Sequence, residues 1–174
     1  MYEIGVHIAD VSHFVKPQTA IDLEAAHRGT TVYLVDNRID MIPNVLSSNL
    51  CSLLEGQERL TFSVIWKIDC IKAEILETKF AKTIIKSKGA LTYAEAQLRI
   101  DSKEMNDEVT LSLRRLNSLA KILRQKRLDK GALILANASE IKFVDVESET
   151  HDNVTQIESK QIRETNSMVE EFML

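Results

Sequence analysis

Two histidines and one aspartate recur at intervals of three near the N-terminus, as His7, Asp10 and His13. Imidazole and carboxylate groups together can bind a divalent transition metal. Their spacing, however, matches neither one face of a helix nor the strict alternation of a strand. We therefore favour hydrogen bonding around the end of a strand for these side chains. A metallohydrolase that uses them is the weaker alternative.

Two of the three tyrosines, Tyr33 and Tyr93, could contribute aromatic rings to a binding site. A tyrosine ring can stack on an unpaired base with roughly 1 to 3 kcal/mol per base. Packing in the core is the commoner use of such a ring, and the sequence on its own favours it. Asn166 and Glu170 are four residues apart, so they share one face of a terminal helix. They either line a site or form the edge of an exposed face.

Basic side chains are frequent between residues 108 and 130, where the apolar residues recur at helical spacing. They are Arg114, Arg115, Lys121, Arg124, Lys126, Arg127 and Lys130. Such a stripe could bind RNA phosphates. We favour the simpler interpretation that it is the solvated side of an amphipathic helix, with cations placed favourably toward the C-terminal end of the helix dipole.

Several common classes of enzyme and binding module are excluded by missing motifs. The sequence has no glycine-rich phosphate loop, GxSxG elbow, HExxH helix or CxxC pair. Cys51 and Cys70 stand apart, which argues against a zinc site and favours reduced thiols. The net charge of −4 argues against a polycation, so any contact with RNA must be local. Neither a membrane span nor a signal peptide is present, which predicts a nuclear or cytoplasmic protein that is not secreted.

The pattern of apolar residues predicts an α+β fold with a largely antiparallel sheet and flanking helices. The clearest strand is 60–70, and it pairs with a second alternating run, 75–85, as a hairpin. Further strands are expected near 3–9, 31–35, 132–135 and 140–146. Thr92 and Glu95 form the sequence signature of a capping box that begins a short helix. Other helices are expected at 21–28, 47–54 and 108–128, and at the C-terminus. No linker divides residues 1–174, so one domain is expected.

Both ends of the sequence lead us to expect a domain truncated on each side. Residues 1–3 run directly into a strand pattern, and the terminal helical pattern around Val169 and Met173 reaches Leu174 without a glycine cap or a basic last turn.

The amino-acid sequences of several segments resemble those of the catalytic domain of the RNase II and RNase R (RNB-domain) family, in the same order and with the same spacing. The segments are Gly5–Phe14, Arg28–Leu34, Met41–Pro43, Leu46–Leu53, Arg59–Ser63, Leu91–Ala96 and Arg163–Glu171. The resemblance covers essentially the whole chain. The amino-acid sequences of Tyr93–Asp101 and Glu149–Asp152 are more similar to the members found in the eukaryotic exosome than to the bacterial ones.

The resemblance implies a hydrolytic enzyme that degrades single-stranded RNA processively from its 3′ end, with an exosome core as a partner. It also implies magnesium held by clustered aspartates, which are expected just before residue 1, whereas an arginine motif and a further glutamate are expected after Leu174. An incomplete domain of this kind would be inactive alone. The alternative of a different class is a non-catalytic module that binds RNA or assembles with the exosome.

The same resemblance implies roles for single residues. Tyr33 corresponds to the tyrosine that positions the 3′-terminal nucleotide, Tyr93 to an aromatic residue associated with RNA binding, and Glu170 to the active-site glutamate. For Asn166 the expectation comes from spacing: it shares a helix face with Glu170 and is expected to bind RNA beside it. Leu135 stands where bacterial members place a stacking phenylalanine, which puts the clamping of a base by two aromatic rings in doubt.

Overall fold

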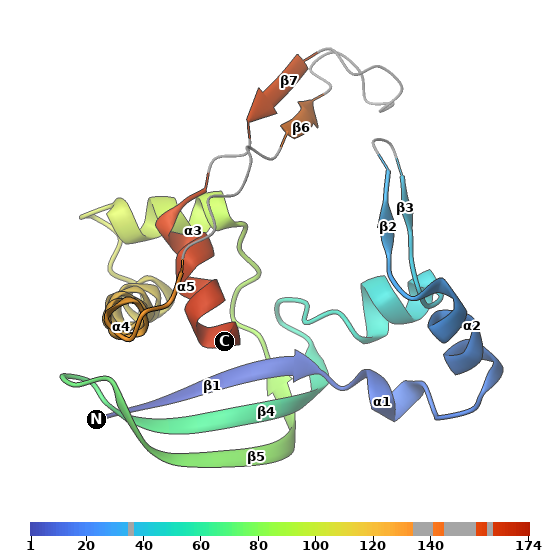
Figure 1. The fold of residues 1–174 in the computed structure, drawn as a ribbon, viewed down its shortest axis with the longest axis horizontal. Helices are drawn as coiled ribbons and strands as arrows, with labels where there is room; N and C mark the ends of the chain where they lie inside the picture. The colour runs from blue at the N-terminus through green and yellow to red at the C-terminus, as the bar shows by residue number, and fades with distance from the viewer. Residues whose placement is uncertain (35–36, 134–140, 145–155, 160–161) are drawn as a thin grey trace.

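The computed structural model describes residues 1–34, 37–133, 141–144, 156–159 and 162–174. Its central element is a three-stranded antiparallel sheet in the order β1-β4-β5, built from β1 (Tyr2–Ala9), β4 (Glu58–Asp69) and β5 (Glu74–Lys86). Val6 pairs with Val64, and Val64 pairs with Phe80, so side chains of the same face lie in rows across the sheet. The strands curve strongly along their length (Figure 1).

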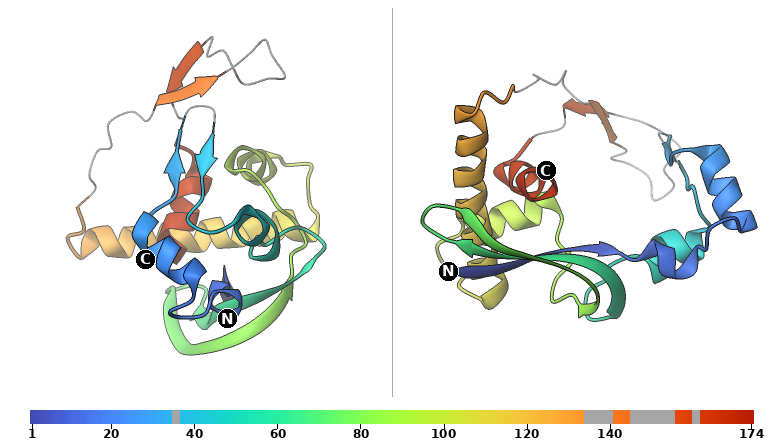
Figure 2. Two further views of the ribbon diagram at one scale, coloured as in Figure 1. Left: turned by 90° about the vertical axis from the view of Figure 1, so that its right-hand side faces the viewer. Right: turned by 60° about the horizontal axis from the view of Figure 1, so that its bottom comes forward.

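Three helices cover one face of this sheet, as the views in Figures 1 and 2 show. They are α3 (Tyr93–Asp101), α4 (Glu108–Asp129) and α5 (Glu164–Met173). The core forms where α4 meets the sheet, with Ile4, Ile68 and Leu119 buried together. Apolar burial at this contact anchors the long helix, and α3 and α5 pack against it.

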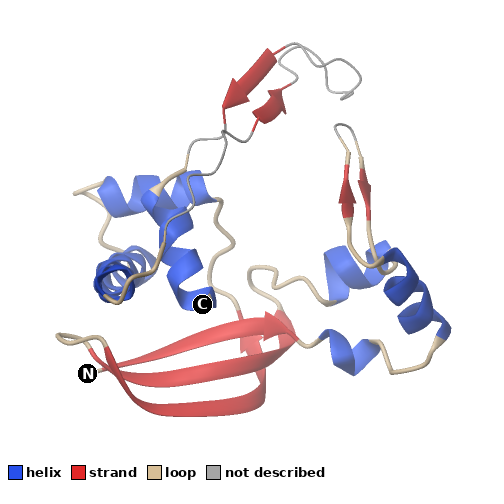
Figure 3. Cartoon of the chain, in the orientation of Figure 1, coloured by secondary structure: helices blue, strands red, loops and turns tan. Residues whose placement is uncertain are grey.

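A smaller group of elements lies beyond one end of the sheet (Figure 3). It contains the helices α1 (Val11–Phe14) and α2 (Ala20–Arg28), the π-helical segment η1 (Val45–Leu50), and the hairpin of β2 (Val32–Tyr33) and β3 (Arg38–Ile39). A further hairpin is formed by β6 (Ile141–Val144) and β7 (Gln156–Ser159). Among the helices of the described ranges, none is both long and apolar enough to cross a membrane.

The expected α+β class with a largely antiparallel sheet is confirmed. The hairpin of 60–70 and 75–85 is present as β4 and β5, and the strand near 3–9 as β1. The helix expected at 47–54 begins earlier, at Val45, and is π-helical. The strand expected at 132–135 is not formed at Ala132 and Leu133, and its remaining residues lie outside the described ranges.

Local signals explain where two of the helices begin. At α3, the Thr92 side chain accepts the Glu95 amide at 3.2 Å, while Glu95 Oε2 accepts the Thr92 amide at 2.8 Å. This reciprocal capping box satisfies two amides that lack partners within the helix. At α4, the Asp107 side chain accepts the amides of Val109 and Thr110. Both helices therefore begin where a side chain replaces the missing backbone acceptor.

Candidate functional site

Tyr33 lies on the short β2–β3 hairpin and is 76% exposed. Sequence patterning alone favoured burial of this ring, and that expectation is wrong. The physical reason is that β2, within the described ranges, pairs with the two-residue strand β3 alone, and both residues of β2 are exposed. An exposed ring is available to stack on a base.

The base of this hairpin is held by a polar network around Asp40. Tyr33 pairs directly with Arg38, whose Nε lies 2.7 Å from Asp40 Oδ1 and whose Nη2 donates to Ser48 at 2.7 Å. Ser47 donates to the other Asp40 oxygen at 2.8 Å. The Ser47 hydroxyl and the Arg38 guanidinium hold the pKa of Asp40 below its ordinary value. These contacts join the hairpin to η1 and fix the strand that carries Tyr33.

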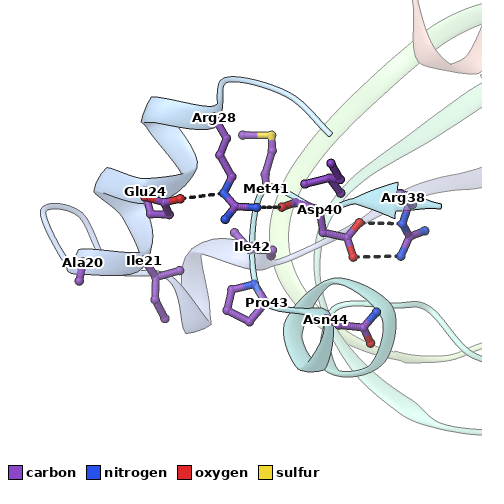
Figure 4. A pocket seen from close by; sticks show the side chains of 11 residues that line it. Ala20, Ile21, Glu24, Arg28, Arg38, Asp40, Met41, Ile42, Pro43 and Asn44 are labelled. Carbon is purple, nitrogen blue, oxygen red and sulfur yellow. Dashed lines mark hydrogen bonds and ion pairs between the residues drawn. The ribbon is translucent and has the colours of Figure 1, made fainter. Parts of the chain in front are cut away.

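A pocket of about 570 Å³ opens beside this network, between α2 and the segment that follows β3 (Figure 4). Arg28 crosses it, pairing with Glu24 at 2.9 Å and donating to the Asp40 carbonyl at 2.9 Å. Its apolar wall includes Met41 and Pro43. Both guanidinium groups near the pocket are neutralised by carboxylates of the same chain, so the pocket carries little net charge for binding an anion.

Tyr93 is the first residue of α3 and is 46% exposed. Its carbonyl oxygen accepts a hydrogen bond from Thr165 Oγ1 at 2.9 Å, and Thr165 belongs to the first turn of α5. In the same turn, Asn166 accepts the Arg163 amide through Oδ1 at 3.0 Å. The structure thus brings Tyr93 and Asn166 to neighbouring ends of two contacting helices.

Glu170 is exposed on α5, one turn after Asn166, whereas the adjacent Glu171 is buried. Glu171 receives two hydrogen bonds from the Arg127 guanidinium of α4. Sequence reasoning missed Glu171. The two residues of the pair are 44 positions apart, and no periodic pattern links them.

The predicted site residues fall into two groups in the structure. Tyr93, Asn166 and Glu170 lie on the contacting helices α3 and α5, while Tyr33 lies on the β2–β3 hairpin on the other side of the molecule (Figures 1 and 2). The structure does not bring Tyr33 next to Glu170. Leu135 lies outside the described residues.

Four cations of the basic stripe on α4 are engaged within the chain. Arg114 caps the turn between α3 and α4 by donating to the carbonyls of Ile100 and Met105. Lys121 pairs with Glu164 at 2.8 Å. Lys126 reaches the Ala73 carbonyl, and Arg127 binds Glu171. These cations therefore serve first to connect elements of the fold.

The histidines and aspartate of the N-terminal cluster have separate partners. His7 Nδ1 lies 2.7 Å from Ser63 Oγ on the neighbouring strand, and the His13 ring packs edge-on against Phe14. Asp10 is buried, accepts Ser12 Oγ at 2.5 Å and pairs with Lys82 at 3.0 Å. Hydrogen bonding around the end of β1, the favoured interpretation, is what the structure shows for His7 and Asp10, whereas His13 makes a ring contact instead.

The described portion of the chain contains no group of three histidine, cysteine or acidic residues arranged to hold a metal ion. Cys51 and Cys70 are free, and burial raises the pKa of the Cys51 thiol, which disfavours the thiolate that metals bind. Magnesium takes oxygen ligands, and the described residues gather no carboxylate cluster that fits it, so we assign no metal ligand among them.

Comparisons with known proteins place this geometry in context. Exosome complex exonuclease RRP44 of Homo sapiens is 61% identical over 172 residues, which cover 99% of this chain and 18% of that protein. A protein named inactive exonuclease DIS3L2, from Arabidopsis thaliana, is 38% identical and is matched over 99% of this chain and 17% of its own length. The chain thus spans less than a fifth of the length of these curated relatives.

Among solved structures, Mycoplasma genitalium RNase R in complex with ribose-methylated single-stranded RNA superposes with a TM-score of 0.86 at 28% identity. The superposition covers 98% of this chain and 26% of the RNase R chain. A family model described as the RNB domain matches residues 1–174. The chain therefore belongs to the RNB domain family.

Proposed function

We propose that this chain forms the central part of the catalytic domain of a hydrolytic exoribonuclease. The complete enzyme would degrade single-stranded RNA processively from its 3′ end, in RNA processing and decay with the exosome. The observation that carries the proposal is the family match over residues 1–174, together with 61% identity to an exosome exonuclease. The exosome core would be bound by regions of the parent protein other than this chain, in the nucleus, the cytoplasm or both.

Within that function, we assign the exposed ring of Tyr33 to the 3′-terminal nucleotide and the exposed carboxylate of Glu170 to the active site. Tyr93 and Asn166 would contact RNA at the adjoining ends of α3 and α5. The exposure of Tyr33, Tyr93 and Glu170 supports these roles, because a residue that contacts RNA must be reachable from solvent.

Magnesium is part of the proposal for the complete domain, as the family resemblance implies. Its ligands are not gathered in the described residues, so we propose that the 174-residue chain does not hydrolyse RNA alone. The test is to incubate the purified chain and, separately, the complete parent protein with magnesium and single-stranded RNA. We expect nucleoside monophosphates from the complete protein only, and their loss when magnesium is chelated.

A second candidate function is a non-catalytic module that binds RNA or assembles with the exosome. The observation that favours it is the 38% identity to a relative named as an inactive exonuclease, because family membership then does not guarantee activity. The same experiment separates the two candidates. RNA binding by the complete protein without nucleotide release would support the second function. Robust release of nucleoside monophosphates by the isolated chain would refute the proposal that its activity depends on other regions of the parent protein.

A further inference from the structure

The ion pair between Arg127 and Glu171 joins the last turn of α4 to the last turn of α5. Arg127 Nη2 donates to Glu171 Oε1 at 2.6 Å, and Arg127 Nε donates to Oε2 at 3.2 Å. The Glu171 side chain is 3% exposed and that of Arg127 is 31% exposed. A guanidinium that grips a carboxylate with two nitrogens fixes its orientation as well as its distance.

The other polar contacts that α5 makes with neighbouring helices, among the residues described, are all at its first turn. Thr165 bonds Tyr93 and Gln97 of α3, while Glu164 bonds Asn117 and Lys121 of α4. The pair with Arg127 is the polar contact at the far end of the helix. It therefore adds a polar restraint on the rotation of α5 at the end where Phe172 packs against the core.

Glu170 precedes Glu171, so its side chain projects about 100° around the helix from the bound carboxylate. Because Arg127 holds Glu171 inward, Glu170 is held on the exposed side of α5. The negative charge of Glu170 also helps to raise the pKa of Arg127, after the larger effect of the Glu171 hydrogen bond. Both carboxylates therefore lie within electrostatic reach of the same guanidinium.

We propose that Arg127 is a positioning residue for Glu170: by binding Glu171, it sets the rotation of α5 and thereby the place of the Glu170 carboxylate. The inference rests on the proposed function of Glu170 in the active site. Side chains lie about 5 to 6 Å from a helix axis, so a rotation of about 20° would move the carboxylate by about 2 Å. A misplacement of about 1 Å can lower a rate by about a hundredfold.

The test uses the complete parent protein and single-stranded RNA, with single-turnover cleavage rates, RNA affinity and thermal stability measured for each variant. Arg127→Ala should lower the cleavage rate at least about tenfold while RNA affinity stays within about twofold of wild type. Arg127→Lys keeps the charge without the two-pronged geometry and should give an intermediate rate. The matched control is Lys121→Ala, which removes the other ion pair between α4 and α5 and should change the rate by no more than about twofold.

A wild-type cleavage rate in Arg127→Ala, or equal losses in Arg127→Ala and Lys121→Ala at similar melting temperatures, would overturn the inference. If Arg127→Ala fails to fold, the rate of Arg127→Lys decides, and a wild-type rate there rejects the inference. Glu170→Gln separates the inference from the function on which it rests. A slow Glu170→Gln with a normal Arg127→Ala rejects only the role of Arg127, whereas a wild-type rate in Glu170→Gln rejects the role of Glu170 itself.

Discussion

The hydroxyl of Thr165 donates a hydrogen bond of 2.9 Å to the carbonyl oxygen of Tyr93, and Thr165 is 1% exposed. This bond joins the first turn of α5 to the first residue of α3 across 72 positions of sequence. Tyr93 and the helix that carries Asn166 and Glu170 are therefore parts of one connected unit. A change at Thr165 should disturb this unit without touching any of the three side chains.

Replacing Thr165 with valine keeps the shape of the side chain but removes the donor, so the hydrogen bond that joins the first turn of α5 to the Tyr93 carbonyl is lost. We expect a local cost of about 0.5 to 1.5 kcal/mol, the usual net contribution of one hydrogen bond. Amide hydrogen exchange in the complete protein should therefore speed up at the start of α5. Thr165→Ser retains the hydroxyl and is the matched control. Equal exchange rates in Thr165→Val and wild type would show that the bond contributes nothing.

The purified chain should self-associate through an apolar row on the sheet. Ile8, Phe62, Phe80 and Ile84 are exposed, and the strand register places them on the same face. Exposed apolar patches of this kind favour association. The double variant Phe80→Thr/Ile84→Thr places β-branched threonines, which suit a strand, at both positions of β5 and should shift the chain toward monomer in size-exclusion chromatography with light scattering.

Ile71 is more exposed than any of these four residues but lies in the β4–β5 turn, away from this row, so Ile71→Thr is the control and should leave association unchanged. A wild-type chain that elutes as a monomer and melts in one sharp transition would contradict the prediction.

Asp10 should make the stability of the sheet depend on pH. The Ser12 hydroxyl and the Lys82 ammonium lower the pKa of Asp10 below its ordinary value of 3.8. A carboxyl whose pKa falls on folding stabilises the fold above its unfolded pKa, and this contribution is lost as pH drops through the folded pKa. Asp10→Asn should therefore unfold at lower urea concentration than its parent near neutral pH, with the gap closing below about pH 3.8.

Trp66 is the single tryptophan and lies in β4, so its fluorescence can report this unfolding. The parent protein would be the more soluble Phe80→Thr/Ile84→Thr chain, and Asp10→Asn would be added to it. Lys67→Met removes an exposed ion pair with Glu77 elsewhere on the sheet and serves as the control. If the difference in urea midpoint between Asp10→Asn and its parent stays constant with pH, titration of Asp10 is ruled out as the cause.

Features set by neighbouring residues were predictable from the sequence. The alternation of 60–70 and the capping box of Thr92 and Glu95 depend on contacts within a few positions, and both are present in the structure. Local patterns fix such elements because the period of the side chains follows from backbone geometry. The same apolar patterns predicted the α+β class, which the structure confirms, and the family resemblance is confirmed by the comparisons.

Features set by distant residues were not predictable in the same way. The exposure of Tyr33 follows from the shortness of β3, and β3 itself gave no periodic signal. The pairing of Arg127 with Glu171 depends on how α4 and α5 pack, which neither helical pattern specifies. The sequence therefore favoured interpreting the basic stripe as the solvated face of a helix, although four of its cations hold neighbouring elements together.

Tyr33 and Glu170 should act on the same end of the RNA in the complete enzyme, although this chain alone does not bring them together (Figure 1). The ring would fix the terminal nucleotide, while the carboxylate would bind a sugar hydroxyl or orient the attacking water. Tyr33→Ala should therefore weaken the positioning of the last nucleotides and change the length of the final product. Glu170→Ala should mainly lower turnover, because the reacting groups are misplaced.

The double variant distinguishes one shared site from two independent ones. When two residues act as a unit, the double variant loses less transition-state stabilisation than the sum of the two single variants. We therefore expect the two defects to combine less than additively. Single-turnover rates and final product lengths would be measured for both single variants and the double. Tyr2→Ala, which removes a partly exposed tyrosine from β1, controls for the loss of a ring as such. Fully additive defects would place Tyr33 and Glu170 in separate steps. Wild-type rates and product lengths in both single variants would remove them from the site, because neither side chain would then be needed for positioning or for turnover.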